Sequence, residues 1–81
     1  MIFEHTFLME RNGMETEIPM EILAEFMEDE YGRPYAELSV HAVDPEVDEQ
    51  AVEYVRKNRV ALAEEAFKVA RERRDEQMIP D

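Results

Sequence analysis

Two glutamates and a histidine are the residues of this chain best suited to do chemistry together. If residues 35–43 form the third strand of a sheet in the expected register, Glu21 faces His41 and Glu4 lies in the same row. Carboxylates and an imidazole can bind Zn²⁺ or a similar ion, and they can act as general acids and bases. The same residues also fit a simpler arrangement, in which a surface histidine pairs with adjacent acids and has no further role.

Acidic side chains dominate the chain, and they are unevenly spread. The net charge is −12 at pH 7. Residues 1–50 hold 14 acids and two bases, whereas residues 51–81 hold seven of each, so the first part carries the whole imbalance. Direct binding to nucleic acid is not expected, because affinity for a phosphate backbone comes from cations. The acidic part suits a basic protein surface, or it serves only to keep a small protein soluble.

The Asn12-Gly13 pair predicts a tight β-hairpin, because a type I′ turn needs positive φ at both of its central residues. In the register that this turn dictates, Glu10 faces Glu15 next to the turn. One face of the hairpin is then apolar and the other acidic, and a slip by one residue would destroy that separation. The expected core face comprises Phe3, His5, Phe7, Met9, Thr16, Ile18, Met20 and Ile22.

Residues 19–32 fit two structures. As a helix they have a proline at the first position and a glycine at the end. As a strand they continue the alternation of the hairpin. We expect the strand, because it extends a register that the turn already sets, and we expect residues 28–34 to form the second turn. The inward residues of this strand are then Met20, Ile22, Ala24 and Phe26.

Residues 35–43 are typical of a third strand, in which Ala36 faces Phe26 and the side chains of Ala36, Leu38, Val40 and Ala42 point inward. Asp44-Pro45 ends this strand. Residues from about 48 to 76 predict one helix of roughly 43 Å. A nine-residue strand spans only about 30 Å, so the helix should extend past the sheet. Its last turns are then solvated or contact a second subunit.

The predicted fold class is α+β, a three-stranded antiparallel meander with one face packed by a long C-terminal helix (β-β-β-α). We expect a single domain over residues 1–76 and a frayed tail over residues 77–81. No apolar run approaches the length of a membrane span, and MIFEHTFLME is charged too early for a signal peptide. A cytoplasmic protein without membrane contact is therefore expected.

One helix covers one face of a sheet, so the other face must meet water or a partner. We call this other side the open face; its outward side chains are mainly glutamates, with a few aliphatic side chains among them as at an interface. Glutamates that face each other cost about 0.2–1 kcal/mol per pair, unless water or cations from elsewhere screen them. The candidate binding residues on this face are Glu4, Leu8, Glu10, Glu15, Glu17, Glu21, Leu23, Glu25 and His41.

Two other polar residues fall on the apolar side. We expect His5 to be a hydrogen-bonded interior histidine rather than a ligand. Arg59 interrupts the apolar stripe of the helix and is expected to extend along the edge of the core, or to reach a carboxylate or a partner. The chain has no cysteine, no G-x-S-x-G, no phosphate-binding glycine loop and no metal-binding motif. We therefore expect no catalytic residues, no cofactor and no enzyme activity.

The opening MIFEHTFLMERNGMETEIP, followed by YGRP and a charged C-terminal helix, resembles small phage-encoded proteins of uncharacterised function. Those proteins begin with a strand rich in Phe, His and Thr, turn at Asn-Gly and continue with Glu-rich alternation. The likeness is confined to the N-terminal half, and this chain departs from it in the turn chemistry of EDEYGRP. It implies a phage or prophage origin and an accessory role, such as inhibition of a host or defence protein.

Three functions remain open. The first is a non-enzymatic acidic interaction protein whose open face binds a basic surface of a host or defence protein, in the extreme as a nucleic-acid mimic. The second is a structural homodimer or assembly component, paired through overhanging helices or open sheet faces. The third is a metal-binding module or metal-dependent hydrolase that uses Glu4, Glu21 and His41.

Overall fold

The computed structural model describes residues 1–77, and it begins with the predicted hairpin. Strand β1 (Ile2–Arg11) pairs antiparallel with β2 (Met14–Glu28), and Glu10 faces Glu15 as the turn requires. Asn12 and Gly13 have φ values of 53° and 76°, the left-handed conformation that a type I′ turn needs. The predicted register is confirmed along the whole of β1.

Residues 19–28 are extended, so the helical alternative for this segment is wrong. Strand β2 has 15 residues, and its alternating burial continues that of the hairpin. The second turn follows it: the Asp29 carboxylate accepts hydrogen bonds from the backbone N–H groups of Tyr31 and Arg33, both at 2.9 Å. Gly32 supplies the positive φ, at 73°. The second turn therefore forms as an Asx-type turn at Asp29, whereas the first turn forms at an Asn-Gly pair.

Strand β3 (Pro34–Ala42) completes a three-stranded antiparallel sheet in the order β1-β2-β3, and Ala36 faces Phe26 as predicted. The register then shifts between Glu21 and Ile22. The last residue of β3, Ala42, pairs with Glu21, so β3 stops two residues short of pairing with Pro19 of β2. This end point agrees with the chemistry of Pro19, which has no N–H to donate to a neighbouring strand.

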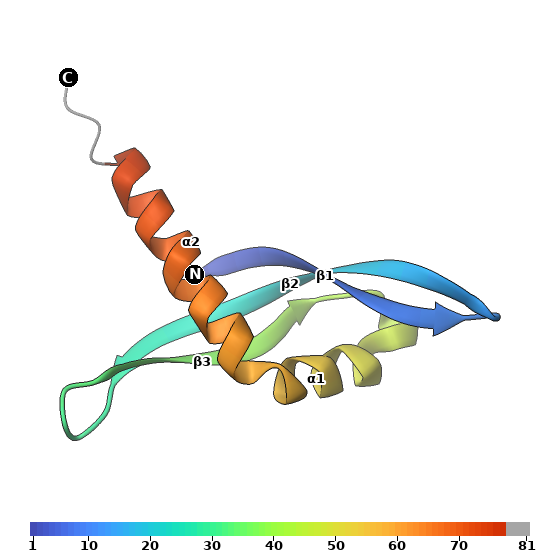
Figure 1. The fold of residues 1–81 in the computed structure, drawn as a ribbon, viewed down its shortest axis with the longest axis horizontal. Helices are drawn as coiled ribbons and strands as arrows, with labels where there is room; N and C mark the ends of the chain where they lie inside the picture. The colour runs from blue at the N-terminus through green and yellow to red at the C-terminus, as the bar shows by residue number, and fades with distance from the viewer. Residues whose placement is uncertain (78–81) are drawn as a thin grey trace.

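The single long helix predicted for residues 48–76 is wrong, because the chain forms two helices that meet at Asn58. A 3₁₀ turn η1 (Pro45–Val47) leads into α1 (Asp48–Lys57), and α2 (Arg59–Gln77) follows. The Asp44 carboxylate caps η1 by accepting from the N–H of Glu46 at 3.0 Å. Figure 1 shows that the two helices meet at a sharp angle.

Asn58 makes the break between α1 and α2. Its backbone N–H and its side-chain amide both donate to the Tyr54 carbonyl, at 3.0 and 2.9 Å. Its own carbonyl accepts from Leu62 at 2.9 Å, so it closes one helix and opens the next. Asparagine offers the backbone such local partners, and this competition favours helix ends over helix interiors. Arg59 is exposed at the first position of α2, and it lines the grooves between the helices and Leu38 of β3, at the edge of the core as predicted.

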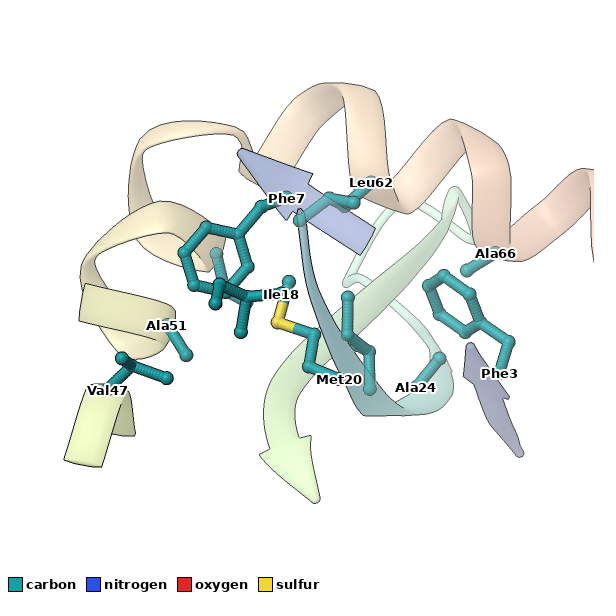
Figure 2. Close-up of a cluster of buried hydrophobic side chains, with 11 residues drawn as sticks. Phe3, Phe7, Ile18, Met20, Ala24, Val47, Ala51, Leu62 and Ala66 are labelled. Carbon is teal, nitrogen blue, oxygen red and sulfur yellow. The ribbon is translucent and has the colours of Figure 1, made fainter. Parts of the chain in front are cut away.

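Both helices pack on the predicted apolar face of the sheet. In Figure 2, Phe3, Phe7, Ile18, Met20 and Ala24 of the strands meet Val47 and Ala51 near α1, and Leu62 and Ala66 of α2. Phe26 is less buried than expected, although its ring lies 5.1 Å from that of Phe67. The bend at Asn58 lets α1 cover the hairpin while α2 covers the strand ends beside Phe3 (Figures 1 and 2).

The C-terminal half of α2 extends past the sheet beside the first residues of β1, as predicted (Figure 1). The predicted reason is wrong, because the 19 residues of α2 span only about 28 Å, no more than a nine-residue strand. The first residue of the predicted tail at 77–81, Gln77, is the last residue of α2. Residues 78–81 lie outside the described residues. No helix within residues 1–77 is long and apolar enough to cross a membrane. The fold is thus an α+β sheet with two helices on one face.

Ile22 tests the core directly, because its side chain is 0% exposed at the centre of the middle strand. We expect Ile22→Val to lower the free energy of unfolding by about 0.5–1.5 kcal/mol and Ile22→Ala by about 2–5 kcal/mol. Urea denaturation followed by circular dichroism measures both. Val60→Ala is the control, because Val60 is 73% exposed and its truncation should change stability by less than about 0.5 kcal/mol. Equal losses at the two positions would contradict the described core.

Candidate functional site

The open face is the side of the sheet that carries neither helix, and most of its side chains are exposed. Glu4, Leu8, Glu10, Glu15, Glu17 and Glu25 are exposed, and Glu21 and Leu23 are half-buried. The structure therefore brings these eight predicted binding residues onto one surface. Strand alternation explains this arrangement, because successive members of the set lie an even number of residues apart along β1 and along β2.

Three pairs of glutamates face each other directly across this surface. The predicted pairs are present, Glu4 with Glu21 and Glu10 with Glu15. The register of β3 adds a third pair, Glu25 with Glu37. The nearest cations with ion pairs lie elsewhere: Arg11 contacts Glu46 at 2.6 Å and Asp44 at 3.8 Å, on the side of the sheet that faces the helices. The open face is thus a run of paired carboxylates.

Aliphatic side chains lie between these acids. Leu8 is 58% exposed and faces Glu17. Leu23 lies between Ile2 on β1 and Ser39 on β3, and Ile2 is also exposed. Sequence reasoning missed Ile2, although one more step along the predicted register, past the pair of Phe3 with Ile22, would have placed it opposite Leu23. The surface therefore offers apolar contact as well as charge, as interfaces do.

The predicted row of Glu4, Glu21 and His41 does not form. The register shift places Ala42, not His41, opposite Glu21, so His41 is the extra residue of a β-bulge. The inserted residue also reverses the face to which the next side chain points, so Ala42 is exposed instead of inward. Among the side chains that the structure describes, residues 1–73, no three acidic, histidine or cysteine groups are placed so that they could hold a metal ion. The prediction that His41 faces Glu21, in one row with Glu4, is therefore wrong.

His5 is a hydrogen-bonded interior histidine, as predicted, and its side chain is only 19% exposed. Its Nε2 lies 3.1 Å from the Tyr54 hydroxyl and its Nδ1 lies 3.0 Å from a carboxylate oxygen of Glu65. With Nδ1 protonated, the ring donates to Glu65 and accepts from Tyr54. The Tyr54 ring also stacks on Phe7, with centroids 5.0 Å apart. This contact joins β1 to both helices across the break at Asn58, on the side away from the open face.

The exposed side of α1 carries a separate set of ion pairs. Arg56 and Lys57 contact the Glu53 carboxylate at 2.6 and 3.7 Å. The hydrogen bond from Arg56 lowers the pKa of Glu53, and the positive charges of Arg56 and Lys57 lower it further. These contacts are spaced three and four residues apart on one helix, so they stabilise the helix surface and do not form a site.

Comparisons with known proteins add nothing to this geometry: no protein-family model, curated protein or solved structure matches the chain. Inferences about its function therefore depend on its own residues.

The third glutamate pair gives a test of the open face. We expect Glu25→Lys to raise the free energy of unfolding by about 0.2–1 kcal/mol at low salt, because it replaces repulsion with Glu37 by attraction. Glu17→Lys is the matched control, because it changes the net charge equally but faces Leu8. Urea denaturation at low and high salt measures the difference between the two variants. A difference that is absent at low salt, or that does not shrink with salt, would contradict the pairing.

Proposed function

We propose that the protein is a non-enzymatic interaction module that binds a basic surface of another protein through its open face. The observation that supports this proposal is the set of three facing glutamate pairs, Glu4 with Glu21, Glu10 with Glu15 and Glu25 with Glu37, on a surface that no helix covers. A fold gains nothing from opposing like charges, and arginine or lysine side chains inserted between the carboxylates would relieve the repulsion.

Exposed aliphatic side chains support a protein partner rather than small cations. Leu8 and the Ile2–Leu23 row lie among the carboxylates, so a partner with cations around an apolar centre would match both features of the surface. In its extreme form this module occupies a nucleic-acid-binding site of its partner, with carboxylates in place of phosphates. The resemblance to phage accessory proteins makes a host or defence protein in the cytoplasm the expected partner.

The relative cost of the pairs fits this proposal. Each facing pair destabilises the sheet by about 0.2–1 kcal/mol in the free protein. Charge-assisted hydrogen bonds to a bound arginine are worth about 1.5–3 kcal/mol each. Binding one cation per pair therefore more than offsets the repulsion. Because binding also removes the repulsion between the two glutamates, that relief adds to the affinity for the partner.

The open face is tested with a variant that reverses four of its charges. We expect an arginine-rich peptide, added in an amide NMR titration at low salt, to shift the resonances of open-face residues. The combined change Glu4→Lys, Glu17→Lys, Glu21→Lys and Glu25→Lys should abolish these shifts without unfolding the domain. Added salt should weaken the binding of the unmodified protein steeply.

The control variant reverses four exposed acids away from this face: Glu28→Lys, Glu30→Lys, Glu64→Lys and Glu72→Lys. It has the same net charge as the first variant, so it separates the arrangement of the acids from their total. It should keep most of the peptide affinity. Equal loss in both variants, or shifts centred on the helices, would disprove the proposal.

A further inference from the structure

The two outer edges of the sheet are protected differently. Strand β3 begins at Pro34 and contains the bulge at His41, and its edge is flanked by grooves against both helices. Prolines, bulges and covering elements are the usual means by which an edge strand avoids pairing with another chain. Strand β1 has ten residues in an unshifted register and no proline, and a groove against α1 flanks only Phe7, Leu8 and Met9.

The backbone of β1 presents a regular row of unpaired groups at its free edge. The N–H of Ala24 donates to the Met1 carbonyl at 2.7 Å, which sets the phase of the ladder between β1 and β2. Alternate residues of β1 therefore bond to β2, and those between them direct their N–H and C=O groups outward. The outward set is Ile2, Glu4, Thr6, Leu8 and Glu10.

We propose that β1 pairs antiparallel with β1 of a second copy of this chain, about a two-fold axis at Thr6. Thr6 then faces Thr6 of the second copy, and the ladder extends over residues 2–10 of both. On the open face Glu4 meets Leu8 and Ile2 meets Glu10, so no two carboxylates are opposed across the new edge. The result is a six-stranded sheet with one continuous acidic face.

The side chains on the helical side of the sheet match equally well in this register. His5 meets Phe7 of the second copy, and Phe3 meets Met9, so aromatic and apolar groups face one another. Like-charge contact would arise in the alternative register centred on Glu4, which opposes that residue to itself. The register centred on Thr6 therefore overlaps the whole strand and opposes no two carboxylates.

The way β1 matches itself supports a second copy as the occupant of this edge. A two-fold axis at Thr6 lets the whole strand pair with its own copy, and no two carboxylates of β1 oppose each other in that pairing.

Sedimentation equilibrium over a range of protein concentrations tests the assembly. We expect a mass of twice the chain, and a dimer that strengthens as salt rises, because each copy carries a net charge of −12 and salt screens the overall repulsion. This salt dependence is opposite to that expected for binding a basic partner, so either proposal can fail without the other. A monomer at every concentration and salt would overturn the dimer.

A single introduced cysteine tests the register, because the chain has none of its own. Hydrogen-bonded partners in antiparallel strands have Cα atoms about 5.5 Å apart, within the range of a disulfide. Under mild oxidation Thr6→Cys should form a covalent dimer at least about tenfold faster than Glu37→Cys, an exposed control on the same face of β3. Non-reducing electrophoresis measures the rates. Equal rates would place any dimer contact elsewhere and overturn the pairing through β1.

Discussion

The two-residue turn at Asn12-Gly13 is the constraint on which the rest of the structure depends. Positive φ at both residues sets the pairing of β1 with β2, and side chains alternate strictly in that pairing. A shift of one residue would put Phe3, Phe7 and Ile18 in water and the glutamates against the helices. The apolar core and the acidic open face are therefore two consequences of one register, and neither could exist without the other.

The helices adapt to the sheet through a local interaction at Asn58. A straight helix from Asp48 onward could not follow a twisted sheet from the hairpin to the strand ends. The double hydrogen bond from Asn58 to the Tyr54 carbonyl ends α1 and allows α2 to change direction. The contact of His5 with Tyr54 and Glu65 then ties β1 to both helices. One asparagine and one histidine thus determine how the apolar face is covered.

The facing glutamates of the open face lower the stability of the sheet, and the same glutamates are the basis of the proposed binding surface. Three facing glutamate pairs oppose folding slightly, and the stability of the sheet has to come from its apolar side. Such a surface is suited to a basic partner, and pairing through β1 would widen it without opposing further carboxylates. Both proposals arise from the same alternation, since the residues that direct their backbone groups to the free edge of β1 also direct their side chains to the open face.

The sequence by itself determined the α+β class, the hairpin, its register and the placement of eight candidate binding residues on one face of the sheet. It could do so because the turn residues and the alternation of apolar and acidic residues act over short distances along the chain. Only the tertiary structure decided the bulge at His41, the exposure of Ala42 and the division of the helix at Asn58. The bulge depends on how β3 fits a twisted β2 near Pro19, and the break depends on how the helices cover both ends of the sheet. These are contacts between distant segments, and a pattern of residue types along the chain does not record them.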